Sequence, residues 1–298
     1  MTAAAFGPQS RIGLVGLGSM GGGIAHCLLR KGYPLQLFAR DPRVLNPFVE
    51  AGAQAVSSAA AMGRECDLVF LSLPDAAAVE AVLFGADGLA EGLRPGSCVV
   101  DTSTIAATSV RKFGERLAQR GIMLLDGPVS GGQQGAEAGT LACMIGGAAE
   151  TVDACREVMA AFCKQVTHVG ALGAGQTVKA CNQVAVAGAM LGVADAMALA
   201  TSQGVDPNVM REVLLAGTAK SLALERHGLR VIAGDFKPGF RAILMRKDLR
   251  IALATAKGGG AQLPCATVAE RLLDELCESG RAEWDWVAVA KLVQEKKS

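Results

Sequence analysis

The chain has 298 residues, of which 51% are apolar and 19% are charged, and 29 Lys and Arg residues balance 28 Asp and Glu residues. This length allows two domains, and the apolar content allows a large core. The balanced charge leaves no electrostatic footprint for nucleic acid or an anionic membrane, so we expect neither as a partner.

Residues 1–10 lack the charged and apolar segments of a signal peptide, and we expect a cytoplasmic protein. The sequence contains no C-x-x-C pair and no histidine at zinc-finger spacing, so we expect no metal site. We interpret the cysteines as buried free thiols of a reducing compartment. They are Cys27, Cys66, Cys98, Cys143, Cys155, Cys163, Cys181, Cys265 and Cys277.

The first predicted strand, Ile12–Gly16, runs into a glycine-rich loop, and a helix-like segment, Gly22–Lys31, follows it. In such a strand–turn–helix unit the first glycine allows the tight turn, the second admits a pyrophosphate and the third lets the helix pack closely. The helix N-terminus then offers N–H groups to the phosphates. We therefore predict a dinucleotide site, with an ordinary tight turn as the alternative. The candidate contacts are Gly16, Leu17, Gly18, Ser19, Met20 and Gly21.

Short apolar runs then alternate with helix-like segments, which predicts a mainly parallel, doubly wound Rossmann sheet over residues 1–170. The further strands are expected at Leu35–Ala39, Leu68–Leu73, Ser97–Asp101, Met123–Asp126, Leu141–Gly146 and Val166–Val169, and helices at Ala107–Arg120 and Ala149–Ala161.

Arg40 follows the second predicted strand, and Asp41 comes one residue later. An acid at the strand end binds the ribose hydroxyls of NAD, whereas an arginine meets the 2′-phosphate of NADP. We favour NADP. In the alternative, Arg40 stacks on the adenine and Asp41 takes the ribose, and use of both cofactors is possible.

From about Gly173 the β-rich runs end and long apolar-periodic segments follow, so residues 171–298 are expected to form an all-helical domain. Val184–Ala200 is almost wholly apolar but short for a bilayer span, and it carries Asp195. We interpret it as a helix buried between domains or subunits, and we expect a homodimer or homotetramer.

Hydride transfer to a carbonyl builds negative charge on oxygen, which a positioned proton donor must meet. None of the three histidines has an acidic residue at a spacing that would indicate a catalytic His–Asp pair. Lys179, early on a largely apolar helix, is a candidate instead, because burial of an ammonium group is costly. Asn182 shares its helix face and is a candidate to hold the reacting oxygen. The alternative is a lysine that extends to water.

Two more candidate regions follow strand ends, where parallel sheets bind ligands. Gly131 and Gly132 expose backbone N–H groups suited to a carboxylate, and Ser130 adds a hydroxyl, although a plain loop is the alternative. Ser103 and Thr104 follow the Ser97–Asp101 strand, and Leu73-Pro74 ends another.

Four ordered segments resemble the β-hydroxyacid dehydrogenase family. They are Gly16–Gly21, Asp126-Gly127-Pro128-Val129-Ser130-Gly131-Gly132 with Gly139-Thr140-Leu141, Gly173–Asn182, and Lys247-Asp248-Leu249. The resemblance runs from about residue 11 to 280. Within the family, Asn182-Gln183-Val184, Phe236–Arg241 and Gly260–Pro264 are most similar to the tartronate semialdehyde (2-hydroxy-3-oxopropionate) reductases.

The resemblance implies that Lys179 and Asn182 are catalytic and that Ser103, Ser130, Gly131 and Gly132 lie at a small-molecule substrate. It also implies that Thr104, Leu73, Pro74 and Lys247 contact the cofactor, with Lys247 and Asp248 closing over it. For Lys247 and Asp248, the alternative is an exposed helical salt bridge that contributes little to stability.

Two departures from the family pattern stand out. The family often has Asn-Asn where this chain has Asn182-Gln183, and a serine near the C-terminus is replaced in Trp284-Asp285-Trp286-Val287. The resemblance favours an NADP(H)-dependent reductase of a small carboxylated aldehyde. The alternatives are an NAD-dependent 3-hydroxyisobutyrate or L-threonate dehydrogenase, an imine reductase, and a non-catalytic cofactor-binding reader. Lys179 argues against the last two.

Overall fold

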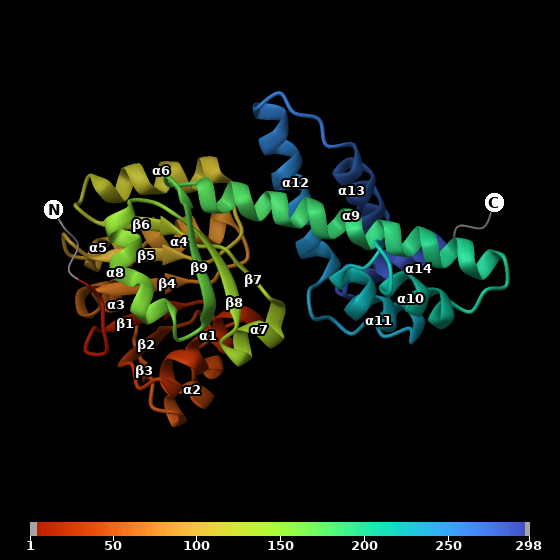
Figure 1. The fold of residues 1–298 in the computed structure, drawn as a ribbon. Helices are drawn as coiled ribbons and strands as arrows, with labels where there is room; N and C mark the ends of the chain where they lie inside the picture. Colours follow the sequence, from red (N-terminus) through yellow and green to blue (C-terminus); the bar gives the residue numbers. More distant parts are fainter. Residues whose placement is uncertain (1–4, 296–298) are drawn as a thin grey trace. The chain divides into compact units, whose positions relative to one another are not determined.

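A computed structural model describes residues 5–295 and divides the chain into two compact units, Met1–Lys179 (unit 1) and Ala180–Ser298 (unit 2). The first four residues of the stretch inspected for a signal peptide lie outside the described range. Figure 1 follows the order of the elements along the chain.

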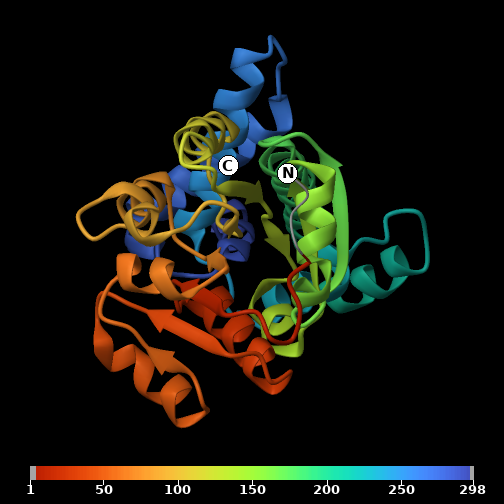
Figure 2. The ribbon, with the colours of Figure 1, turned by 90° about the vertical axis from the view of Figure 1, so that its left-hand side faces the viewer.

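Unit 1 is built on one mainly parallel sheet, which confirms the predicted Rossmann fold. Strands β1 to β6 pair in parallel, in the order β3-β2-β1-β4-β5-β6, and β8 and β7 follow at the β6 side. Figure 2 shows the sheet from the orange β2–β3 edge to the green β8 and β9. The strands are β1 (Ile12–Val15), β2 (Leu35–Phe38), β3 (Gln54–Ala55), β4 (Leu68–Leu71), β5 (Cys98–Asp101), β6 (Met123–Asp126), β7 (Val129–Ser130), β8 (Leu141–Gly146) and β9 (Cys163–Gly170).

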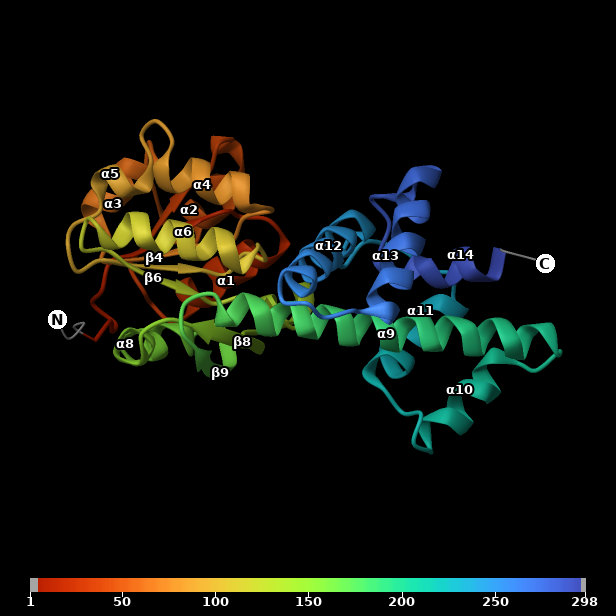
Figure 3. The ribbon, with the colours of Figure 1, turned by 90° about the horizontal axis from the view of Figure 1, so that it is seen from above.

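Helices cover both faces of this sheet because its central strands are apolar on both sides. Figure 3 shows α3, α4, α5 and α6 on one side of the strands and α8 on the other. Two separate buried cores result, one under each set of helices. The helices of unit 1 are α1 (Ser19–Arg30), α2 (Asn46–Glu50), α3 (Ala59–Glu65), α4 (Ala76–Phe84), α5 (Leu89–Gly92), α6 (Ala107–Ala118), α7 (Gly132–Ala138) and α8 (Ala149–Met159).

The prediction differs from the structure mainly at the β8 side of the sheet. β8 runs antiparallel to β6 and β7, and β9 extends over more residues than the predicted Val166–Val169. The two-residue strands β3 and β7 were not predicted, because so short a segment shows no periodicity.

In the described part of unit 2 the regular elements are all helices, joined by turns and loops, apart from an isolated bridge between Arg241 and Asp285. Its core is formed by one stripe of α9 and by the helices that follow it. The long helix α9 (Ala174–Ser202) begins in unit 1 and continues into unit 2. The others are α10 (Pro207–Leu215), α11 (Gly228–Ile232), α12 (Ala242–Gly258), α13 (Pro264–Leu276) and α14 (Val289–Glu295).

Among the described helices, α9 alone is long and apolar enough to pass a length-and-composition test for a membrane span. That test is also passed by the core helices of ordinary globular proteins, and α9 contributes Met190, Ala194 and Met197 to the core of unit 2.

The expectation of nine buried thiols is only partly right. Six cysteines are buried, Cys277 is half-buried, and Cys181 and Cys265 are exposed. All nine are free thiols. Cys181 lies on α9 and Cys265 is the second residue of α13, and neither belongs to the core of unit 2.

Candidate active site

The segment from the end of β1 into the first turn of α1 requires glycine at two of its three predicted positions. Gly16 has a φ of 97°, and a Cβ there would collide with the Ser72 carbonyl oxygen. A Cβ on Gly21 would collide with the Gly16 carbonyl oxygen. At Gly18, in contrast, a Cβ would meet no atom of the described residues within 4 Å. The first and third glycines thus allow the turn and the packing, and the second leaves the backbone open.

The first turn of α1 is suited to an anion. Helix α1 begins at Ser19, and among the described residues no side chain caps it and no acid occupies its first turn. Its unpaired N–H groups and the positive end of its dipole therefore remain for a phosphate. Leu17 and Met20 are half-buried, and Ser19 is exposed. The backbone here is open, as the glycine spacing requires, and the contact of this loop with a pyrophosphate stays a prediction.

At the end of β2, the carboxylate of Asp41 is engaged locally. Arg43 donates to both oxygens of Asp41, with Nε–Oδ1 and Nη2–Oδ2 distances of 2.9 and 2.8 Å. Asp41 also accepts the backbone N–H of Arg43 and caps the short 3₁₀ turn that follows. These hydrogen bonds from Arg43 lower the pKa of Asp41. Arg40, one residue earlier, is exposed.

The loops after β4 and β5 are joined through Ser103. The Ser103 hydroxyl accepts the N–H of Leu73 at 2.9 Å, and the Ser103 N–H donates to Asp101 Oδ1 at 2.9 Å. Ser103 is buried, whereas Thr104 is half-buried and Pro74 is exposed. Ser103 therefore holds two strand-end loops together, a role that sequence reasoning did not predict. Its predicted place near a substrate stays a prediction.

The loop after β7 has the open backbone expected of an anion cradle. Gly131 and Gly132 have φ values of 134° and 64°, both are exposed, and Ser130 is half-buried. Helix α7 follows at once and packs directly on α1, because a Cβ on Gly23 would lie 2.7 Å from the carbonyl carbon of Ala136. The predicted substrate loop and the predicted cofactor helix are therefore brought together within unit 1.

The first turn of α9 is fixed to the end of β6 by Asp126. The two carboxylate oxygens of Asp126 accept the N–H groups of Gly173 and Gln176, at 2.7 and 2.8 Å. Burial raises the pKa of Asp126, and these backbone hydrogen bonds lower it in part. The approach is so close that a Cβ on Gly175 would lie 2.5 Å from the Asp126 carbonyl oxygen. Asp126 is thus a cap for α9 supplied by a distant strand.

Gln176 ties the same turn to the loop after β5. Its Nε2 donates to the Ser103 carbonyl at 2.8 Å, and its Oε1 accepts the N–H of Ile105 at 3.1 Å. Lys179 lies three residues later, on the same helix face, and is only 7% exposed. The lysine is therefore carried by a helical turn that hydrogen bonds hold to the ends of two strands, β5 and β6.

Further along α9, in unit 2, Asn182 and Gln183 meet the pair Lys247–Asp248 on α12. Asn182 Nδ2 donates to Gln183 Oε1 at 2.8 Å, and Gln183 Nε2 donates to Asp248 Oδ2 at 2.7 Å. Lys247 Nζ lies 2.9 Å from Asp248 Oδ1. Because Asp248 is 3% exposed, the pair is not the weak surface salt bridge considered as an alternative.

Among the residues that had no predicted role, three act on α9 or on its side chains. They are Asp126, Gln176 and Gln183, each of which makes hydrogen bonds that position a predicted site residue or its helix. A signal for two of them was present. Gln176, Lys179 and Gln183 form a polar stripe at helical spacing along an otherwise apolar helix, and all three are buried.

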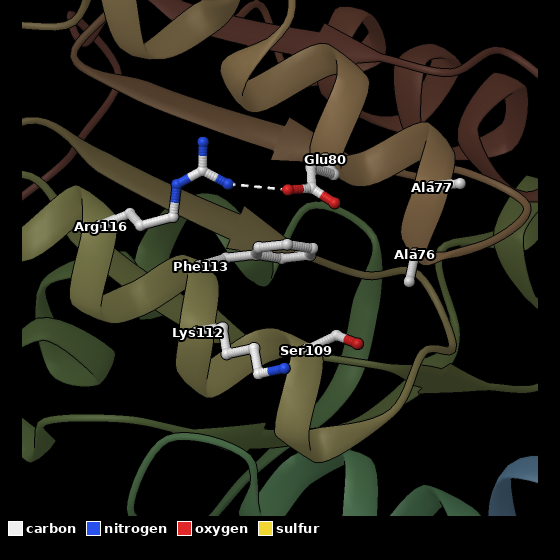
Figure 4. A pocket seen from close by; sticks show the side chains of 7 residues that line it. All are labelled: Ala76, Ala77, Glu80, Ser109, Lys112, Phe113 and Arg116. Carbon is white, nitrogen blue, oxygen red and sulfur yellow. Dashed lines mark hydrogen bonds and ion pairs between the residues drawn. The ribbon is translucent and has the colours of Figure 1, made fainter.

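A hollow of about 400 Å³ lies elsewhere in unit 1, between α4 and α6. Figure 4 shows the ion pair of Glu80 and Arg116 across it, with the ring of Phe113 beside them. None of the predicted site residues lines it. The lining residues are Ala76, Ala77, Glu80, Ser109, Lys112, Phe113 and Arg116.

Two family models match the chain. Residues 11–170 match the one described as the NAD binding domain of 6-phosphogluconate dehydrogenase. Residues 173–293 match the one described as NAD-binding of NADP-dependent 3-hydroxyisobutyrate dehydrogenase. Together the two matches span most of the chain and meet near the start of α9.

Curated relatives match over nearly their whole length. An NAD-dependent L-serine dehydrogenase of Pseudomonas aeruginosa is 38% identical over 95% of this chain and 98% of its own. A 2-hydroxy-3-oxopropionate reductase of Escherichia coli is 34% identical over 95% of this chain and 97% of its own. Among solved structures, a Mycobacterium tuberculosis 3-hydroxyisobutyrate dehydrogenase with L-serine has a TM-score of 0.89 and 29% identity, and covers 96% of this chain and 99% of its own.

Proposed function

Because the chain belongs to the family of NAD(P)-dependent β-hydroxyacid dehydrogenases, we propose that it is an NADP(H)-dependent reductase of a small carboxylated aldehyde such as tartronate semialdehyde. The family relation makes the chain an oxidoreductase with a nicotinamide cofactor. The finer proposal, with its substrate class and NADP preference, includes the reverse reaction, oxidation of the matching β-hydroxyacid.

One observation carries the proposal: Lys179 is buried on a helical turn that Asp126 and Gln176 fasten to the strand ends. A buried ammonium group is costly to maintain, so a position that fixes one so firmly calls for a functional reason. The side-chain amide of Asn182 lies about one helical turn after Lys179, on the same face of the helix.

The roles follow from the chemistry of the reaction. When bound, the nicotinamide ring supplies the hydride for reduction and accepts it in oxidation. Lys179 Nζ donates a proton to the oxygen that gains charge, and Asn182 hydrogen-bonds the same oxygen. The N–H groups of Gly131 and Gly132, with the Ser130 hydroxyl, bind the carboxylate. The loop Gly16–Gly21 holds the pyrophosphate.

The preference for NADP rests on the end of β2. Arg43 occupies both oxygens of Asp41, which supports the reading that Asp41 does not serve the ribose hydroxyls. The exposed guanidinium of Arg40 is then the group that would meet a 2′-phosphate.

A second candidate is NAD-dependent oxidation of L-serine or 3-hydroxyisobutyrate. The relative with 38% identity is named for L-serine and NAD, and L-serine is itself a β-hydroxyacid with a carboxylate. The same lysine, amide and carboxylate cradle would serve this substrate, so the candidates differ in the cofactor and in the groups around the second carbon.

A substrate panel with both cofactors distinguishes the candidates. Tartronate semialdehyde, glyoxylate, succinic semialdehyde and methylmalonate semialdehyde are reduced with NADPH or NADH. L-Serine, 3-hydroxyisobutyrate and L-threonate are oxidised with NADP⁺ or NAD⁺. We expect the highest kcat/KM for tartronate semialdehyde with NADPH. A higher kcat/KM for L-serine with NAD⁺ would favour the second candidate, and no turnover of any aldehyde would contradict the proposal.

A further inference from the structure

Four polar side chains of unit 2 form a linear chain of contacts from α12 to α9. Lys247 Nζ pairs with one oxygen of Asp248, and the other oxygen accepts from Gln183 Nε2 at 2.7 Å. Gln183 Oε1 in turn accepts from Asn182 Nδ2 at 2.8 Å. This series of contacts begins at the charged pair Lys247–Asp248. It ends at the Asn182 amide, which the proposed function places at the reacting oxygen.

The direction of these hydrogen bonds is fixed at one end. An ionised carboxylate only accepts hydrogen bonds, whereas an amide side chain donates from nitrogen and accepts at oxygen. Asp248 therefore requires the NH₂ group of Gln183, and this turns Gln183 Oε1 toward Asn182. That oxygen requires an N–H in turn, so the NH₂ group of Asn182 faces Gln183.

Burial makes the alternative orientations costly. Gln183 and Asp248 are 5% and 3% exposed, so a flipped Gln183 would set its carbonyl against the carboxylate with little water to screen them. Met245 Sδ, 3.5 Å from Gln183 Nε2, is only a weak acceptor and agrees with the same orientation. Asn182 itself is half-buried and open to a ligand.

We propose that Gln183 is a positioning residue: it transmits the acceptor polarity of Asp248 to Asn182, so that the substrate oxygen meets the Asn182 amide in one orientation only. The inference rests on the role assigned to Asn182 in the proposed function. It also gives a reason for the departure Asn182-Gln183, because glutamine is one methylene longer than the asparagine common in the family and its amide reaches the carboxylate on α12.

A double-mutant cycle tests this inference. Gln183→Met keeps the length of the side chain and removes both hydrogen bonds, and it is made in the wild type and in Asn182→Ala. In the wild type we expect kcat to fall about 10-fold, the worth of one well-placed hydrogen bond, with the Kd for NADPH within two-fold. In the Asn182→Ala background we expect Gln183→Met to have no further effect, because its action passes through Asn182.

Met190→Leu serves as the control, since Met190 is fully buried on the same helix and the exchange conserves volume. It should leave kcat unchanged at a comparable melting temperature. An equal loss from Gln183→Met in both backgrounds would show a structural effect and overturn the inference. No loss in the wild type would do the same.

A readout without turnover separates this inference from the proposed function. In ¹⁵N-edited NMR spectra we expect the Asn182 side-chain amide to exchange slowly with water, unlike that of the exposed Asn46. Gln183→Met should abolish that protection. An unprotected Asn182 amide in the wild type would overturn the inference, whatever the outcome of the substrate panel.

Discussion

At the end of β2, two neighbouring side chains of opposite charge, Arg40 and Asp41, are the candidates for selecting the cofactor. Asp41 is held by Arg43, which neutralises it and lowers its pKa, while Arg40 is exposed. The residue types alone left both readings open. The contact that favours Arg40 comes from a third residue, Arg43, whose orientation no sequence pattern predicts.

We expect Arg40→Ala to raise the Kd for NADPH about 10- to 100-fold, the worth of a charge-assisted hydrogen bond to a phosphate, with little change for NADH. Fluorescence titration with both cofactors measures this. Lys31→Ala is the control. It also removes one positive charge, but at the C-terminal end of α1 and not at the end proposed to bind the phosphates. Equal losses of affinity for the two cofactors would argue against a 2′-phosphate contact.

At the scale of single elements, α9 depends on a cap that comes from β6. The hydrogen bonds of Asp126 to Gly173 and Gln176 cross 47 and 50 positions of the chain. Sequence reasoning predicted the helix from its apolar period and from the glycine-rich turn that precedes it. It did not predict the cap, because local capping patterns only relate residues a few positions apart.

We expect Asp126→Asn to lower the free energy of unfolding by about 1–3 kcal/mol, because an amide nitrogen would face one of the two N–H groups. Urea unfolding measures this, and Asp153→Asn, at an exposed carboxylate of α8, should stay within about 0.5 kcal/mol of wild type.

The difference in free energy of unfolding between wild type and Asp126→Asn should depend on pH, and the sign of that dependence is defined. The pKa of Asp126 is raised in the folded protein, so between the unfolded and folded pKa values the folded state binds more protons. The stability that Asp126 contributes is therefore complete below its unfolded pKa, near 3.9, and declines as the pH rises through the folded value. An advantage of wild type over Asp126→Asn that grew with pH would contradict this assignment.

At the scale of the whole molecule, the strong periodic signals predicted the architecture. The parallel strands β1, β2, β4, β5 and β6 were expected from apolar runs, and their ends differ from the prediction by at most two residues. The antiparallel insertion of β8 was not expected, because strand direction depends on pairing between distant segments. The contacts of Gln176 and Gln183 were missed for a related reason, since their partners lie on other elements.

The expected homodimer or homotetramer stays a prediction. Unit 2 supports it through large apolar side chains that are exposed on α9 and α10, among them Leu199 at 66% and Val213 at 65%.

The central claim is that Lys179 is the proton donor, and its removal tests that claim most directly. We expect Lys179→Ala to depress kcat about 10²- to 10⁴-fold, with the Kd for NADPH unchanged because the proposed contacts to the dinucleotide are made by other residues. Lys179→Arg should not restore turnover, since a guanidinium barely releases a proton near neutral pH. Lys164→Ala, at an exposed position of β9, is the control and should match wild type. An Ala variant that keeps more than about a tenth of the wild-type kcat would contradict the account.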